Sequence, residues 1–491
     1  MPSRLIDKIV GIFRTPKNSK SAEESNTPLS APKTPISANA DELPVIIKED
    51  VHQIQRKYLD DNAAKVVYRL NDSGYDGYLV GGCIRDLLLK KRPKDFDVAT
   101  NAHPEDAHAL FKRSSLIGRR FKLLHVRFGR DIIEVATFRA GHDTLEDDTE
   151  GHGKQSESGL ILRDNVYGTI EEDALRRDFT INALYYCVKD HSIYDFTNGY
   201  SDIKQKVIRM IGDPESRYRE DPVRMLRAIR FAAKLDFEIE RATEKPIKEL
   251  ASLLQPIAPA RLFDETLKLF QSGHAVASFQ LLKDYDLLQQ ILPVTAKALK
   301  NAEVYPLLEP LIINGLKNTD RRINQRKSVT PAFLFATLLW HPVQKRMEEI
   351  LSESRMPPLA ALHAAANEII SLQVKRTAIP RRFSAPIREI WELQLRLPKR
   401  FGTRAEQTLE HPRFRAAYDL LLLREQSGES LDDLGQWWTQ YQAASQEDRL
   451  AMVNDLKPDT SSPANRTRKK TRSNQRPRKR AANDPRNNRQ G

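Results

Sequence analysis

Residues 81–89 read Gly-Gly-Cys-Ile-Arg-Asp-Leu-Leu-Leu, and residues 94–100 read Lys-Asp-Phe-Asp-Val-Ala-Thr. The first stretch follows Gly-Tyr-Leu-Val at 77–80, so the pattern predicts a strand, a glycine turn and a helix. Two glycines after a strand let backbone N–H groups approach phosphate oxygens, and Arg85 adds a two-pronged donor. We therefore interpret Gly81, Gly82 and Arg85 as parts of a phosphate-binding loop.

An Asp-x-Asp pair follows this loop. In an extended segment, the side chains of Asp95 and Asp97 point to one face while Phe96 points to the other. Two adjacent carboxylates repel each other unless a cation lies between them, and Mg²⁺ prefers hard oxygen ligands and substrate phosphates. The pair therefore predicts a metal site for nucleotidyl transfer, holding Mg²⁺ or, as the alternative metal, Mn²⁺.

Two further carboxylates are candidates to complete the catalytic site. Glu134 lies in the strand-forming segment 131–138, where a surface-facing glutamate is the alternative interpretation. Asp178 follows Arg176-Arg177, where a helix N-terminal charge or a buried Arg–Asp pair is the alternative. The sequence does not decide between the two, so both are catalytic candidates.

The remaining patterns predict an α+β protein with a mixed-sheet head followed by an all-α neck and body. Strands are expected at 97–100, 122–128 and 131–138, with a hairpin at Gly129-Arg130, and an amphipathic helix at 51–70. Helical periodicity then dominates from residue 221 to about 446, and no fixed repeat supports a solenoid. The predicted helices are 223–235, 260–270, 275–288, 331–339, 387–395 and 414–423.

Three polar segments lack the apolar pattern of a folded element. Residues 1–48 predict a disordered leader, in which residues 1–14 are an alternative docking segment, and 141–163 predict a mobile loop. The net charge is +13, and residues 466–491 contain eleven basic residues against one acid, Asp484. This tail predicts a polyanion-binding arm, a solubilising tail being the alternative. Its candidate RNA contacts are Arg468, Lys469, Lys470, Arg478, Lys479 and Arg480.

Five motifs occur in an order that resembles the class II nucleotidyltransferases, a family that includes bacterial poly(A) polymerases and tRNA CCA-adding enzymes. They are Gly-Gly-x-x-Arg-Asp, Asp-x-Asp, Glu-Val-Ala-Thr-Phe-Arg at 134–139, Arg-Arg-Asp-Phe-Thr-Ile-Asn-Ala at 176–183 and Glu-Asp-Pro-Val-Arg at 220–224. The resemblance is strong over residues 50–245 and weaker to about residue 430.

The resemblance implies a role for each matching residue. Asp95 and Asp97 hold the metals, and Glu134 supports them and orients the primer hydroxyl. Asp221 and Arg224 match the positions that read the base, and Arg227 and Arg230 continue their three-residue step toward the phosphates, a solvated basic face being the alternative. The full implied nucleotide-binding set is Gly81, Gly82, Arg85, Asp86, Arg177, Asn182, Asp221, Arg224, Arg227 and Arg230.

Several stretches are similar to the poly(A) polymerase branch of that family. They are residues 116–126 with Arg119 and Arg120, the long segment 141–163 followed by 164–168, residues 379–383 with Arg381 and Arg382, and residues 412–419. We expect these four arginines to contact RNA. A CCA-adding enzyme is the alternative, and a non-catalytic RNA-binding adaptor is a second alternative that the intact Asp-x-Asp pair disfavours.

The expected activity is template-independent addition of AMP from ATP to RNA 3′ ends with release of pyrophosphate, in RNA polyadenylation and turnover. The expected partners are ATP, the 3′ ends of mRNA fragments and small RNAs, and proteins of RNA degradation or RNA chaperones. Two cysteines without ligand spacing and no long apolar run predict a cytoplasmic protein without a membrane span. A monomer is expected, although none of these patterns determines the oligomeric state. The expected segments are a leader 1–48, a catalytic head 49–204, a neck 205–272, an RNA-binding domain 273–455 and a basic tail 456–491.

Overall fold

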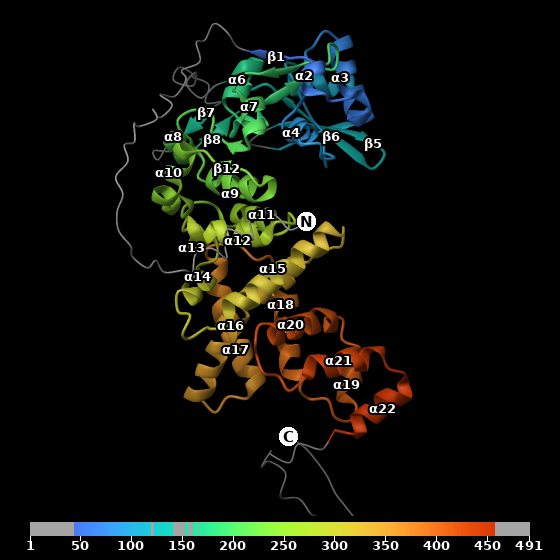
Figure 1. Ribbon diagram of the computed structural model, residues 1–491, viewed down its shortest axis with the longest axis vertical. Coiled ribbons are helices and arrows are strands. Elements are labelled where there is room, and N and C mark those ends of the chain that lie inside the picture. Colours follow the sequence, from blue (N-terminus) through green and yellow to red (C-terminus); the bar gives the residue numbers. More distant parts are fainter. Residues whose placement is uncertain (1–43, 119–121, 141–152, 156–160, 165, 457–491) are drawn as a thin grey trace, which may run out of the picture. The chain divides into compact units, whose positions relative to one another are not determined.

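The computed structural model describes residues 44–118, 122–140, 153–155, 161–164 and 166–456. Its N-terminal half is built on a mixed sheet of eight strands in the order β1-β10-β9-β2-β3-β6-β5-β4 (Figure 1). Strands β3 and β6 are parallel, and the other neighbours in this sheet are antiparallel. The strands are β1 (Val45–Ile47), β2 (Gly77–Val80), β3 (Asp97–Thr100), β4 (Ser114–Ile117), β5 (Leu123–Phe128), β6 (Asp131–Thr137), β9 (Leu184–Tyr186) and β10 (Ile193–Asp195).

One face of this sheet is covered by helices α3 (Asp61–Asp72) and α5 (Pro104–Leu110). The packing is close, because a Cβ on Gly77 of β2 would lie 3.4 Å from Cγ1 of Val67. Strand residues alternate between the two faces, so Val98 and Val135 join the buried cluster while Asp97 and Glu134 face the other way. The alternation places these two carboxylates on the opposite face, where Val80, Ala99 and Tyr185 form a second, smaller buried cluster with Ala174.

Two N-terminal predictions are wrong. Instead of one helix over 51–70, the chain forms α2 (Glu49–His52), a 3₁₀ turn η1 (Arg56–Tyr58) and α3, which starts where Asp60 accepts N–H bonds from Asn62 and Ala63. The apolar periodicity continues through this cap, so it predicted one helix. The cap depends on local hydrogen bonds, which an apolar pattern does not reveal. Strand β1 lies inside the expected leader, because it pairs with β10 far along the chain.

The expected loop 141–163 also contains regular structure, although most of it lies outside the described residues. Strands β7 (Gly153–Gln155) and β8 (Ile161–Asp164) form an antiparallel pair. A ladder of backbone hydrogen bonds needs no apolar alternation, which was the signal that we used for strands. The expectation of a structureless loop is therefore wrong for these two strands.

The rest of the described chain is almost entirely helical, which confirms the predicted α+β class. Helix α9 has the predicted bounds, whereas α16 and α18 are longer than predicted because Pro342 and Pro386, which usually end helices, lie inside them. The helices are α6 (Ile170–Leu175), α7 (Gly199–Gln205), α8 (Pro214–Glu220), α9 (Val223–Leu235), α10 (Arg241–Leu250), α11 (Pro259–Phe270), α12 (Ala275–Asp284), α13 (Leu288–Ile291), α14 (Pro293–Leu299), α15 (Leu308–Asn324), α16 (Pro331–Glu353), α17 (Pro358–Val374), α18 (Arg381–Arg396), α19 (Arg404–Leu409), α20 (Phe414–Gln426), α21 (Leu434–Ala443) and α22 (Gln446–Asn454). Short elements complete the list: η3 (Thr180–Asn182), η4 (Ala251–Leu254), β11 (Val207–Ile208) and β12 (Glu238–Ile239).

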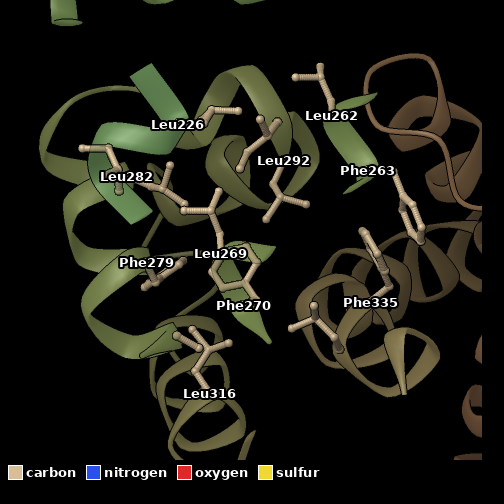
Figure 2. Packing of buried hydrophobic residues seen from close by; sticks show 14 of the residues in the cluster. Leu226, Leu262, Phe263, Leu269, Phe270, Phe279, Leu282, Leu292, Leu316 and Phe335 are labelled. Atoms are coloured by element: carbon tan, nitrogen blue, oxygen red, sulfur yellow. The ribbon is translucent and has the colours of Figure 1, made fainter. Parts of the chain in front are cut away.

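A continuous apolar core joins the helices on both sides of residue 272. Figure 2 shows Leu226 of α9 and Leu269 of α11 packed beside Leu282 of α12. The ring of Phe263 in α11 stacks on that of Phe335 in α16, with 5.9 Å between centroids. The domain boundaries that the sequence predicts after residues 204, 272 and 455 therefore stay predictions. Among the described residues, no helix is both long and apolar enough to cross a bilayer.

Candidate active site

Three neighbouring strands bring the carboxylates and the glycine loop together. Val80, the last residue of β2, pairs with Asp97 at the start of β3. Asp97 in turn lies in register with Glu134 on β6. Neighbouring strands are about 4.8 Å apart, so these two carboxyl side chains leave the same face next to each other. Gly81 and Gly82 follow Val80 directly, which places the predicted phosphate-binding loop beside Asp97.

The electrostatic state of Asp97 is that expected of a cation ligand. Desolvation in the cleft, Glu134 and Asp95 raise the pKa of the Asp97 carboxyl to about 6, against the opposing effect of Arg177. Asp95 lies just before β3, is well exposed, and has its Oδ2 3.5 Å from Nζ of Lys94. Among the described residues, no group of three acidic, His or Cys side chains is already arranged around one metal position. The carboxylate oxygens repel each other and can nevertheless bind a divalent cation, because substrate phosphates supply the remaining ligands of such an ion.

Gly81 has a backbone conformation that favours glycine. Its φ of 80° lies in a region that side-chain-bearing residues rarely adopt, and a Cβ there would lie 3.6 Å from Nη1 of Arg177. Its N–H donates to the carbonyl of Leu184, which fixes the turn against β9. The loop is thus held close to Arg177 before any ligand binds.

Arg85 is buried and fully engaged by neighbouring side chains. It donates to Oδ1 of Asn182 at 2.6 Å and to Oδ1 of Asp86 at 2.6 and 2.9 Å. Its guanidinium also lies 5.3 Å from the ring centroid of Phe231. Asp86 does not line the cleft described below, and its Oδ1 accepts from Arg85, so its place in the nucleotide site stays a prediction. The motif could not show this, because a shared Arg-Asp pattern does not reveal which way each side chain turns.

Asp178 forms a buried ion pair. Its carboxylate accepts from Arg227, from Nδ2 of Asn182 at 3.2 Å and from the backbone N–H of Phe179 at 2.8 Å. Burial raises the pKa of Asp178, but Arg227 and the two other donors outweigh it and bring the value to about 2. This is the buried Arg–Asp pair that was one of the two alternatives for this residue. Its oxygens are occupied, whereas Glu134 lies in register with Asp97 and has its Oε1 3.5 Å from Nε2 of His125.

Arg177 is held in place by a second carboxylate. Its Nη2 donates to Oδ2 of Asp173 at 2.9 Å, and its Nε donates to the hydroxyl of Tyr185 at 2.8 Å. Tyr185 donates in turn to the same carboxylate oxygen. Neither Asp173 nor Tyr185 was predicted, because nothing in their local sequence distinguishes them from ordinary helix and strand residues.

The expected base-reading pair lies at the junction of α8 and α9. Nη1 of Arg224 donates to Oε2 of Glu220 and to the carbonyl of Arg217, both at 2.7 Å. Oδ2 of Asp221 accepts from Nη2 of Arg261 on α11 at 2.6 Å. Helix α11 therefore contributes a residue that the sequence did not indicate.

Two clefts meet at Asp97 and Arg177. The larger, of about 490 Å³, contains every predicted nucleotide-binding residue except Asp86, and the smaller, of about 310 Å³, contains Glu134. Further lining residues of the larger cleft that the sequence did not indicate are Phe231, Lys234, Arg261 and Glu265. The smaller cleft also contains Arg139, Asp173 and Arg176. The pattern that would have found Arg261 and Glu265 is their i, i+4 spacing on one face of α11.

The cleft walls carry a concentrated positive charge. Burial, together with neighbouring guanidinium groups, lowers the pKa of Arg176 to about 9 and that of Arg230 to about 10. Arg230 lies 4.4 Å above the ring of Phe231, and its Nε has no hydrogen-bond partner within the described residues. Such mutual destabilisation of cations is relieved by a multiply charged anion such as a triphosphate.

The predicted RNA-contacting residues are not all brought to this site. Arg381 and Arg382 lie at the start of α18, where Arg382 is 5.0 Å from the ring centroid of Phe383, and they line neither cleft. Arg119, Arg120 and the six cations of the tail lie outside the described residues. Their RNA contacts stay predictions.

Comparison with known proteins gives matches over most of the chain. Residues 77–209 match the family described as "Poly A polymerase head domain", 236–299 match "Probable RNA and SrmB- binding site of polymerase A", and 354–480 match "Polymerase A arginine-rich C-terminus". Poly(A) polymerase I of Salmonella typhimurium is 48% identical over 439 residues, which cover 89% of this chain and 92% of that protein. Poly(A) polymerase I of Haemophilus influenzae is 48% identical over 413 residues, covering 84% and 90%.

CCA-adding enzymes are more distant. That of Lactobacillus helveticus is 35% identical over 247 residues, covering 50% of this chain and 59% of that protein. Among solved structures, the Bacillus stearothermophilus CCA-adding enzyme in complex with CTP has a TM-score of 0.54 at 23% identity, covering 82% of this chain and 84% of that one. At that identity the likeness concerns the fold alone.

Proposed function

The chain belongs to the poly(A) polymerase family and is a polynucleotide adenylyltransferase, and we propose that its reaction takes place where the two clefts meet at Asp97. The larger cleft takes ATP, and the smaller cleft takes the 3′ end of the RNA. The observation that carries this assignment is the position of Asp97 in both clefts, with the phosphate-binding loop on one side and Glu134 on the other.

Binding and orientation follow from the residues of each cleft. Arg177 and Arg230 bind the triphosphate, and Asp221 with Arg224 reads the adenine as an acceptor beside a forked donor. Glu134 accepts a hydrogen bond from the RNA 3′-hydroxyl and thereby directs its oxygen toward the α-phosphate. That oxygen forms a new bond to the α-phosphorus as the bond from this phosphorus to the α,β-bridging oxygen breaks. The hydroxyl proton is released to solvent, and pyrophosphate leaves with the bridging oxygen.

The family uses a divalent metal, which we propose to be Mg²⁺ held by Asp95 and Asp97 with Glu134 in support. Such an ion, when bound, neutralises phosphate charge and lowers the pKa of the attacking hydroxyl. The raised pKa of Asp97 supports this donor set, because the like charges that cause it are those that a cation relieves.

Residues 236–299, which include α10 to α14, support RNA binding by the helical part of the molecule. Cys83 and Cys187 are free thiols, which supports a reducing compartment, and we propose that the enzyme acts in the cytoplasm as a monomer. RNA-degradation or RNA-chaperone proteins are the proposed protein partners.

The first prediction concerns Asp97. Asp97→Asn should reduce AMP addition by at least ~10²-fold, because the metal loses a charged ligand where phosphate charge develops. Binding of RNA should be unchanged, and thermal stability should be unchanged or higher, because one repelling charge is gone. The matched control is Asp131→Asn, an exposed carboxylate at the start of β6 that lines neither cleft. An Asp97→Asn enzyme with the wild-type rate would contradict the assignment.

The second prediction concerns nucleotide choice. Incubation of unstructured RNA with each nucleoside triphosphate separately should give long tails from ATP alone. A tRNA that lacks its 3′-terminal CCA provides the comparison. Addition that requires CTP and stops once the CCA end is complete would show that the protein is a CCA-adding enzyme instead.

A further inference from the structure

Strands β4, β5 and β6 extend the active-site face of the sheet beyond Glu134. On β5 and β6, buried residues alternate with accessible ones, and Leu124, Val126, Ile133 and Val135 are the buried set. His125 pairs with Glu134, Arg127 with Ile132, and Ser115 with His125. Paired residues share a face, so these accessible side chains continue the surface that carries Asp97 and Glu134.

This surface carries unpaired positive charge. Arg113 and Arg127 are exposed and lie together in a hollow of about 490 Å³, with Ser114, Ser115 and Gly129 as its other lining residues. Neither guanidinium has a hydrogen bond or ion pair within the described residues, and the Oγ of Ser115 is buried there without a partner. Like charges placed opposite each other on a sheet are destabilising, so an anion is needed to offset them.

Carboxylates are scarce around the hollow. On β4, β5 and β6 the only acids are Glu134, beside Asp97, and Asp131, which alternates to the other side of the sheet. The side chain of Ile132 is 47% exposed and lies between the hollow and Glu134. A positively charged groove that follows the backbone is one part of the arrangement that binds single-stranded nucleic acid. The exposed Ile132 offers an apolar contact for a base, where such sites commonly use an aromatic ring.

The hollow also lies at a suitable distance from the chemistry. From Asp97 to Arg127 there are two strand spacings across the sheet and two residues along β5, so the two positions are roughly 12 Å apart. A chain whose 3′ end lies at Asp97 and Glu134 therefore reaches the arginines a few nucleotides upstream.

We propose that the open face of β4, β5 and β6 binds the single-stranded RNA segment immediately upstream of the 3′ end, with Arg113 and Arg127 contacting its phosphates and Ile132 contacting a base. This inference rests on the proposed function, since it requires an RNA 3′ end at Asp97. Binding of RNA along this face keeps the 3′-hydroxyl in the smaller cleft, through phosphate contacts that do not depend on the RNA sequence.

The experiment compares full-length wild-type enzyme with the double variant Arg113→Ala/Arg127→Ala on oligo(A) primers of roughly 2 and roughly 15 nucleotides. On the longer primer, KM for RNA should rise roughly tenfold, and the slope of log affinity against log salt should fall by about 1.4, that is ~0.7 per phosphate contact. KM for ATP and kcat at saturating RNA should stay at wild-type values. The shortest primer should show a much smaller effect, since it ends before the hollow.

The matched control is Lys65→Ala/Arg69→Ala, which removes two exposed cations from α3 on the covered side of the sheet. It should leave KM for RNA and the salt slope within error of wild type. An Arg113/Arg127 variant with unchanged KM and slope on the longer primer would overturn the inference, and so would an equal loss on both primers. If the wild-type enzyme itself extends no RNA with ATP, the proposed function fails instead.

Discussion

At the scale of single residues, Asp97 combines the geometry and the electrostatics of the site. It is the carboxylate in register with both the phosphate-binding loop and Glu134, and its raised pKa reports how closely the negative charges are gathered. Asp178, the other candidate, has a lowered pKa because a guanidinium and two hydrogen bonds already satisfy it. Asp97 and Asp178 therefore have opposite shifts. We propose that Glu134, which lies in register with Asp97, is the third catalytic carboxylate and that Asp178, which is paired with Arg227, holds the arginines in place.

A pH dependence follows from the shift of Asp97. Below pH 6 the carboxyl is mostly protonated and binds a cation poorly, so at limiting Mg²⁺ the rate should rise as the pH passes through about 6. Saturating Mg²⁺ should move this midpoint toward lower pH, because the cation favours the ionised form. Glu134→Gln should also lower the midpoint, since it removes a repelling charge. A midpoint that does not respond to metal concentration would contradict the placement of the metal at Asp97.

The same shift has a consequence for stability. A carboxyl whose pKa is higher in the folded state than in the unfolded state favours folding at low pH, and this contribution is lost as the pH rises through about 6. Removal of the charge in Asp97→Asn should therefore raise Tm above pH 6 and have less effect below pH 4. Thermal unfolding of the two proteins over that pH range measures the difference.

At the scale of elements, helix α9 carries two arginines with different tasks. Arg227 is paired with the buried carboxylate of Asp178, whereas Arg230 lies on the ring of Phe231 and forms no ion pair with a carboxylate of the described part of the chain. The two residues are one helical turn apart and both line the larger cleft. One helix thus supplies a structural ion pair and a cation available to the substrate.

Substitution of each arginine should separate these tasks. Arg227→Ala should lower the free energy of unfolding by about 3 kcal/mol, because it leaves Asp178 buried without its partner. Arg230→Ala should leave stability nearly unchanged or raise it, because it removes a mutually repelling cation, while KM for ATP rises roughly tenfold. Denaturant unfolding and steady-state kinetics on both variants provide the measurements. Equal losses of stability would show that the two arginines are structurally equivalent.

At the scale of the whole molecule, we expect RNA affinity to be distributed over more than the active site. The tail from residue 466 has eleven basic residues against one acid, and apart from two prolines its sequence contains no apolar side chain larger than that of alanine. Truncation before residue 466 should flatten the salt dependence by up to ~0.7 per lost phosphate contact and raise KM for RNA. The values of kcat at saturating RNA and KM for ATP should hardly change.

A second variant separates charge from length in that experiment. Replacement of the basic residues of the tail by glutamine keeps the chain length and should reproduce the truncation. If the glutamine variant behaves like wild type while the truncated enzyme does not, the tail acts through its length or a protein partner rather than through its charge.

The sequence by itself determined the local chemistry of this protein. Gly81-Gly82, the Asp-x-Asp pair and the helix of Arg224 follow from spacings of a few residues, because strand alternation and helical pitch place near neighbours without reference to the rest of the chain. The strand pair β5–β6 and most helices were predicted for the same reason. The motifs, taken in order, also identified the family.

Only the tertiary structure decided the long-range partners. Glu134 lies in register with Asp97 and Asp178 forms an ion pair with Arg227, and neither contact could be predicted from local spacing. Asp86 accepts a hydrogen bond from Arg85, and Arg261 of α11 donates to Asp221 in the larger cleft. Residues 45–47 form strand β1 because they pair with β10. Such contacts arise when segments far apart in the chain bury surface against each other, and a linear pattern records the tendency to be buried but not the partner.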